Sequence, residues 1–143
     1  MRYILASDGS EASLRAARFL VLQSCLGPDD EIFVIYVFPL PSDPECYEGV
    51  TELPRDAGDE RVRRAAAPLL RRTVDALAGA PGRLEEVTLL GNPAKEIVEF
   101  ATNLEANLVV AGTRGRSAES EHYLGSVSSA LVHRAPCSVL IVR

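Results

Sequence analysis

Short apolar runs alternate with amphipathic stretches from one end of the chain to the other. The runs are rich in β-branched residues and almost continuously apolar, which is typical of strands covered on both faces, as in a parallel sheet. The run at 84–90 alternates less cleanly and predicts a moderately buried strand. We therefore expect five strands, at residues 3–6, 32–38, 84–90, 108–111 and 139–142.

The amphipathic stretches between these runs predict four helices. Ser10 is placed to cap the first helix, which the Gly-Pro pair at 27–28 would end. Pro68 lies inside the second apolar stripe, so the second helix is either kinked or starts near that proline. We expect the third helix to start after an N-cap at Asn92, which a proline follows, and the fourth to start at Gly125.

Strands and helices alternate through all 143 residues, and nothing in the sequence divides them into two domains. This order predicts one domain, residues 1–143, with a right-handed, doubly wound α/β fold. The predicted architecture is Rossmann-like, with three layers (α/β/α) built around a five-stranded parallel sheet. The segment at 39–58 is rich in Pro, Asp and Glu, and we expect it to be a mobile loop.

The charge balance argues against a protein that binds nucleic acid nonspecifically. Such binding needs clustered cations, whereas this chain has a net charge of −5. Arginines do cluster locally, but their spacing among Ala and Leu favours the solvated face of a helix over a binding patch. These residues are Arg61, Arg63, Arg64, Arg71 and Arg72.

Cysteine usage and apolar segments favour a cytoplasmic protein. The chain has three cysteines, an odd number without a CxxC pair, so neither a disulfide framework nor a zinc site is expected. Cys137 is expected to pack in a buried strand. The N-terminal apolar run is too short for a signal peptide, and no apolar stretch approaches the ~20 residues of a membrane span.

Polar and glycine residues follow several of the predicted strands. Ligands of a doubly wound sheet bind beyond the carboxyl ends of its strands, so we expect the functional site there. Ser7 and Asp8 follow the first strand, and Gly112 ends the fourth. Asp8 could simply cap the following turn, but its place at the carboxyl edge of the sheet favours a functional role.

The segment after the fourth strand has the features of an anion site. Gly112 and Gly115 allow the backbone to turn tightly and to approach a ligand without an intervening Cβ. A helix that starts at Gly125 would direct free N–H groups at an anion. The neighbouring side chains suited to phosphate are Arg114, Arg116, Ser126 and Ser128. On these grounds alone it is an equally good interpretation that the glycines shape a loop and that Ser126 caps a helix.

The sequence lacks a P-loop, since its sole lysine, Lys95, lies elsewhere. Nor does any residue stand out as an activated nucleophile or a positioned base. His122 and His133 have no Ser-His-acid pattern around them, and we expect them on the surface.

The spacing Gly112-x-x-Gly115, nine residues, then Gly125-Ser126 resembles the pattern of ATP-binding universal stress proteins. The flanking sequences are similar to that family as well, at 4–13, 91–97, 107–117, 124–128 and 135–142. The resemblance runs end to end except for the loop at 39–58. Departures are Glu119 and Glu121, where the family has apolar or basic residues, and Ser138, where proline is usual.

The resemblance implies a HUP-type, Rossmann-like fold and a site for ATP with Mg²⁺. Asp8 would lie beside the ribose or a metal-coordinated phosphate, and Val37 would meet adenine through its backbone. Ala6 and Ser7 would edge the nucleotide, and Ala111 would line the base pocket. Contacts to the ribose and phosphates would come from Gly112, Gly115, Gly125 and Ser126, extended by Val127 and Ser128.

The resemblance also implies a homodimer paired through the last strand, which runs from Val139 to Val142. The function it implies is that of a stress-response sensor or regulator that binds the nucleotide without turning it over. Two alternatives stay open. One is slow ATP hydrolysis, with Asp8 holding the metal and Arg114 stabilising charge. The other is a nucleotide-free dimeric scaffold.

Overall fold

The computed structural model describes residues 1–23, 26–40, 54, 56–113 and 124–143. Within these residues five strands and four helices alternate, and each element coincides with one expected from the sequence. In chain order they are β1 (Arg2–Ala6), α1 (Glu11–Gln23), β2 (Glu31–Pro39), α2 (Glu60–Ala76), β3 (Arg83–Gly91), α3 (Pro93–Leu104), β4 (Leu108–Gly112), α4 (Ser126–Arg134) and β5 (Ser138–Val142).

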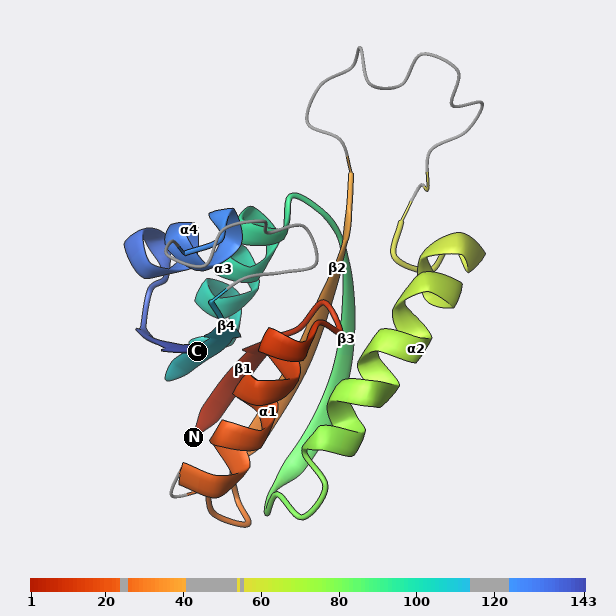
Figure 1. The fold of residues 1–143 in the computed structure, drawn as a ribbon. Coiled ribbons are helices and arrows are strands. Elements are labelled where there is room, and N and C mark those ends of the chain that lie inside the picture. The colour runs from red at the N-terminus through yellow and green to blue at the C-terminus, as the bar shows by residue number, and fades with distance from the viewer. Residues whose placement is uncertain (24–25, 41–53, 55, 114–123) are drawn as a thin grey trace.

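The five strands form one parallel sheet in the order β3-β2-β1-β4-β5. Helices α1 and α2 lie on one face of the sheet, and α3 and α4 lie on the other (Figure 1). The three-layer, doubly wound prediction is therefore confirmed. The chain leaves β1 in one direction through β2 and β3 and continues in the other through β4 and β5. The order thus reverses between β1 and β4, which is where such sheets open a crevice for ligands.

Two separate cores explain why the strand sequences are almost continuously apolar. Alternate side chains of a strand point to opposite faces, and here both faces are covered. In β1, Leu5 joins the core under α1 and α2, while Ile4 joins the core under α3 and α4. Val34 and Ile35 divide in the same way in β2. All four side chains are at most 1% exposed.

Helix α2 runs through Pro68 and does not start there, which decides between the two alternatives for its first residue. Its N-cap is Asp59, whose carboxylate accepts the backbone N–H of Arg61 at 2.9 Å. Arg63 and Arg64 form ion pairs with Glu60. The arginines of this helix are exposed, as expected for its solvated face.

The expected loop at 39–58 falls largely on residues outside the described ones. At its start, β2 continues to Pro39, and the N–H of Leu40 donates to the carbonyl of Gly91 at 3.1 Å. Helix α1 extends to Gln23 within the described residues, and residues 24–25, before the Gly-Pro pair at 27–28, lie outside them. None of the helices in the described ranges is both long enough and apolar enough to cross a membrane.

Helix α3 has a well-formed start and a strained end. Asn92 caps it as expected, its side chain accepting the N–H of Lys95 at 3.1 Å, and Pro93 is the first helical residue. At the other end Glu105 has a φ of 52°, the left-handed conformation that suits glycine.

We expect Glu105→Gly to raise the free energy of unfolding by about 0.5 to 1 kcal/mol, because glycine adopts this φ without steric cost. The pair that Glu105 forms with Arg2, at 3.9 Å and with the Glu105 side chain 88% exposed, contributes little. Urea denaturation would measure the change. Glu105→Ala is the matched control, since it removes the carboxylate but keeps the strain; equal stability of the two variants would contradict the prediction.

Candidate functional site

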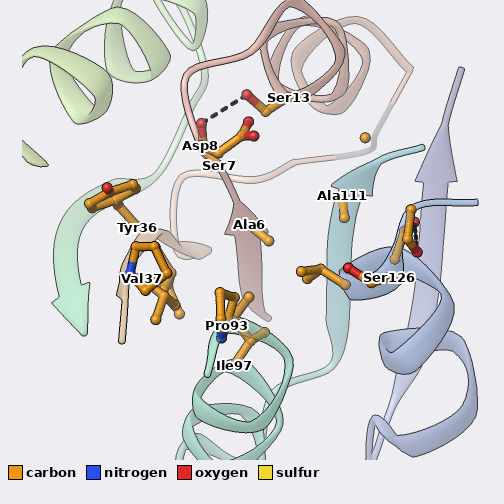
Figure 2. A pocket seen from close by; sticks show the side chains of 16 residues that line it. Ala6, Ser7, Asp8, Ser13, Tyr36, Val37, Pro93, Ile97, Ala111 and Ser126 are labelled. Carbon is orange, nitrogen blue, oxygen red and sulfur yellow. Dashed lines mark hydrogen bonds between the residues drawn. The ribbon is translucent and has the colours of Figure 1, made fainter. Parts of the chain in front are cut away.

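A cavity of about 480 Å³ opens at the carboxyl ends of β1, β2 and β4, facing the first turns of α3 and α4 (Figure 2). This is the crevice at which the strand order reverses. Sixteen residues from the strand ends and from helices α1, α3 and α4 line it. They are Ala6, Ser7, Asp8, Ser13, Ile35, Tyr36, Val37, Pro39, Pro93, Ile97, Ala111, Gly112, Gly125, Ser126, Val127 and Ser128.

The β1–α1 turn, residues 7–10, brings a carboxylate to the edge of this cavity. The side chain of Asp8 lines the cavity, and its Oδ1 also accepts the N–H of Ser10 at 3.0 Å. Ser10 caps α1 as expected, its Oγ accepting the N–H of Ser13 at 3.3 Å. Gly9 makes the turn possible with a φ of 72°. Asp8 therefore caps the turn and also lies at the cavity, and its role toward a ligand stays a prediction.

β2 extends beyond the end of β1 and leaves a peptide edge facing the cavity. The last residue pair between these strands is Ala6 with Ile35, and the N–H of Ser7 then donates to the carbonyl of Ile35 at 2.9 Å. Alternate residues of a strand direct their N–H and C=O groups to the same side. The N–H and C=O of Val37 therefore also face the side of β1, past the point where β1 has ended.

The absence of a side chain at Gly112 has a packing reason in addition to the ligand contact that the sequence predicts. A Cβ at this position would lie 2.6 Å from the carbonyl carbon and 2.7 Å from the carbonyl oxygen of Ala12, in the first turn of α1. Its φ lies outside the left-handed range. The glycine is thus required by the packing of α1 against β4, although Gly112 does line the cavity as well.

Thr113 joins β4, β5 and α4. Its N–H donates to the carbonyl of Val142 at 3.0 Å, and its own carbonyl accepts the N–H of Gly125 at 2.7 Å. The Ser128 hydroxyl lies 2.8 Å from the same Thr113 carbonyl and 3.0 Å from that of Gly125. The Ser128 hydrogen is thereby donated within the protein. Ser128 thus links α4 to the end of β4 and does not offer a ligand the hydroxyl donor expected from the sequence.

The N-cap of α4 is Gly125, in an extended conformation (φ −64°, ψ 163°) and without a side-chain cap. Ser126 is consequently the first residue of the helix, and the interpretation of Ser126 as the cap is wrong. Ser126, Val127 and Ser128 form the first turn, which lies against the cavity. The N–H groups of a first helical turn have no partner inside the helix, and together with the helix dipole they favour an anion.

Comparison with known proteins agrees with this geometry. The sequence model of the universal stress protein family matches residues 1–143, the whole chain. The chain belongs to the universal stress protein family. One relative, from Methanocaldococcus jannaschii, is 32% identical to this universal stress protein over 99% of this chain and 81% of its own. Another, from Thermus aquaticus, is 35% identical over 98% of this chain and 96% of its own.

Solved structures share the fold of this universal stress protein. The protein MJ0577 superposes with a TM-score of 0.78 at 19% identity, over 99% of this chain and 94% of its own. A universal stress protein in complex with cAMP has a TM-score of 0.64 at 25% identity, over 100% of this chain and 97% of its own. An Arabidopsis thaliana family member with AMP bound has a TM-score of 0.64 at 18% identity, over 99% of this chain and 90% of its own.

The structure gathers ten of the thirteen expected site residues around one cavity in this universal stress protein. The other three, Arg114, Gly115 and Arg116, lie outside the described residues, as do Glu119, Glu121 and His122. Six further lining residues are not among the expected site residues, namely Ser13, Ile35, Tyr36, Pro39, Pro93 and Ile97. Pro93 and Ile97 could have been found, because the helix after β3 also starts at the carboxyl edge of the sheet.

No group of three or more His, Cys, Asp or Glu side chains is arranged to hold a metal in the part of the universal stress protein that the structure describes. Mg²⁺ does not require such a group, since it commonly binds one or two carboxylates together with the phosphates of a ligand. Asp8 fits that pattern. His133 lies on the exposed part of α4. Cys137 is partly buried and packs against the core under α3 and α4, where burial raises the pKa of its thiol.

Proposed function

We propose that this universal stress protein binds an adenine nucleotide, ATP together with Mg²⁺, and acts as a stress-response sensor or regulator in the cytoplasm. One observation carries the proposal. The peptide edge of Val37, the carboxylate of Asp8 and the first turn of α4 converge on a single cavity of about 480 Å³. Its size suits a ligand of several hundred daltons. The cAMP and AMP complexes of the structural relatives support the same class of ligand.

The base would lie along β2. An adenine ring has an acceptor at N1 beside a donor at its exocyclic amine, and the N–H and C=O of Val37 offer the complementary pair. Guanine has the reverse pattern at these positions, a donor at N1 and an acceptor at O6. The walls here are apolar, formed by Ile35, Pro93 and Ile97, which suits a flat heterocycle. We therefore expect preference for adenine over guanine.

The phosphates would lie at the first turn of α4, where Ser126 and the backbone N–H groups of the turn offer donors. Gly115, Arg114 and Arg116 would also contact the phosphates, as the family resemblance implies. Asp8 would hold Mg²⁺ jointly with the phosphate oxygens. Bound there, Mg²⁺ would neutralise negative charge on the triphosphate.

We expect the protein to bind ATP without hydrolysing it efficiently. Side chains around the cavity include no histidine, lysine or cysteine among the described residues. The serine hydroxyls at the cavity, such as Ser7 and Ser128, are engaged in hydrogen bonds within the protein. No described group is thus placed to activate water as a general base apart from Asp8, which is the residue proposed for the metal.

We further propose that the protein forms a homodimer through β5. This strand is at one edge of the sheet and pairs with β4 on one side, and edge strands with apolar residues tend to pair with another chain. Val139 and Ile141 are only partly buried, and Val132 on the adjacent α4 is half exposed. Sedimentation equilibrium would detect the dimer, and a monomer at every concentration would contradict it.

The first test is to denature the purified protein and chromatograph the small molecules it releases, and then to titrate ligand-free protein with ATP and GTP by calorimetry. We expect an adenine nucleotide near one per chain and at least about tenfold tighter binding of ATP than of GTP, the equivalent of one to two hydrogen bonds. Protein that is empty and takes up no ATP would contradict the proposal and favour the scaffold. Conversion of ATP to ADP during incubation would favour slow hydrolysis.

Asp8→Asn makes the metal part of the proposal testable. Asparagine keeps an oxygen to accept the N–H of Ser10 and removes only the charge. The variant is expected to lose the dependence of ATP affinity on Mg²⁺ while retaining Mg²⁺-free binding. An unchanged Mg²⁺ dependence would contradict the role of Asp8 at the metal.

A further inference from the structure

One turn of α2 holds the β1–α1 turn, residues 7–10, from outside the cavity. Leu69 lies so close to Gly9 that a Cβ on the glycine would be 2.6 Å from Cδ2 of Leu69. Arg72 donates from Nη1 to the carbonyl oxygen of Gly9 and from Nη2 to Oε1 of Glu11, each at 3.2 Å. The conformation of the turn is thus tied to a helix about sixty residues away in sequence.

Thr73 makes the innermost of these contacts. Its side chain is 0% exposed, and its hydroxyl lies 2.9 Å from the carbonyl oxygen of Leu69, to which it can donate. The hydroxyl of Ser7 lies 2.6 Å from that of Thr73, and either of the two can donate in the bond between them. The oxygen of Ser7 in turn accepts the N–H of Gly9 at 3.2 Å. The bond with Thr73 thus holds the Ser7 side chain in place, and Ser7 supports the backbone of the turn.

We propose that Thr73 is a positioning residue for the nucleotide site, an inference that rests on the proposed function. Thr73 does not line the cavity, so it would act through Ser7 and the turn. Asp8 moves with this turn because its Oδ1 accepts the N–H of Ser10 at 3.0 Å. The base site on β2 is built separately, by Val37. Loss of the Thr73 hydroxyl should therefore weaken binding at the metal and phosphates and spare the base.

Thr73→Val tests this inference, since it replaces the hydroxyl by a methyl group of similar size. A methyl group cannot lie 2.6 Å from Oγ of Ser7 as the hydroxyl does, so the Ser7 side chain would be displaced and the bond that it accepts from the Gly9 N–H would be weakened. Calorimetry on the full chain is expected to give about tenfold weaker binding of ATP with Mg²⁺, the scale of one buried hydrogen bond. Binding of adenosine, which has no phosphate, should stay unchanged, and Thr73→Ser should restore the ATP affinity.

Thr102→Val is the matched control. The hydroxyl of Thr102 makes the same kind of bond, to the carbonyl of Val98 four residues earlier in α3, at 2.9 Å. That residue is exposed and far from the β1–α1 turn, so both affinities should be unchanged. If Thr73→Val fails to fold, Arg72→Lys perturbs the same turn from its exposed side while keeping the charge, and it should weaken ATP binding relative to adenosine.

A second readout needs no ligand. Amide hydrogen exchange at Gly9 and Ser10 in the ligand-free protein should be about tenfold faster in Thr73→Val and unchanged in Thr102→Val. Equal ATP affinity of wild type and Thr73→Val, or an equal loss for ATP and adenosine, would overturn the inference and leave the proposed function standing. Unchanged exchange would overturn it on structural grounds. Wild-type protein that binds neither compound would instead contradict the proposed function, and the inference with it.

Discussion

Gly125→Val is expected to lower the affinity for ATP by about a hundredfold without a measurable change in stability. The φ and ψ of Gly125, −64° and 163°, belong to the extended region that valine favours, so the backbone bears no strain. The N–H that donates to Thr113 at 2.7 Å is kept. What changes is the space at the start of α4, where Gly125 lines the cavity and a branched side chain would displace the phosphates.

Calorimetry with ATP and thermal unfolding, measured on the same preparation, would test this prediction. Leu124→Ala is the control, because Leu124 is the preceding residue, is 41% exposed and does not line the cavity. Its ATP affinity should match that of the wild type. If Gly125→Val binds ATP as tightly as the wild type, the phosphates do not lie at the first turn of α4.

Gly112→Ala should have the larger effect on folding, with a loss of about 2 to 3 kcal/mol in the free energy of unfolding. The new Cβ would meet the backbone of Ala12 at 2.6 and 2.7 Å and its Cβ at 2.9 Å. Backbone atoms cannot move aside as the end of a side chain can, so α1 would have to shift away from β4.

Urea denaturation of Gly112→Ala beside Gly27→Ala would measure the effect. Gly27 is a matched position, since a Cβ there would meet only Oδ2 of Asp30, at an ordinary 3.8 Å, and its φ is not left-handed. We expect Gly27→Ala to change stability by less than about 0.5 kcal/mol. Equal stability of Gly112→Ala and the wild type would contradict the packing role of Gly112. Close approach to a ligand, as expected from the sequence, would then be the reason for the glycine.

The fold could be predicted well because its signals are local. Ile4 and Leu5 must both be apolar, since adjacent side chains of β1 enter opposite cores. The strand therefore appears in the sequence as a continuous apolar run. Asn92 followed by Pro93 marks the start of α3 because capping involves only the next three residues. The order of the strands could not be predicted, because it depends on which crossover passes which strand and no local pattern encodes that.

The candidate site could be predicted where a strand end or a helix start carries it, as at Asp8 and Ser126. It could not be predicted where distant segments meet. The sequence predicts that Gly112 approaches a ligand, but it does not reveal that the first turn of α1, one hundred residues earlier, also requires a glycine there. The contact of Thr73 with Ser7 spans 66 residues and leaves no pattern in either segment. Such long-range contacts depend on how the helices pack on the sheet, which only the three-dimensional structure reveals.

The overhang of β2 past β1 has a consequence for divergence within the family. If the base is recognised by the N–H and C=O of residue 37, every amino acid except proline supplies the same two groups at that position. Substitutions there can then accumulate without loss of ligand preference. What selection would preserve is the length of two neighbouring strands, a property that an alignment of residue types does not record. Relatives with few identical residues could in this way keep the same ligand.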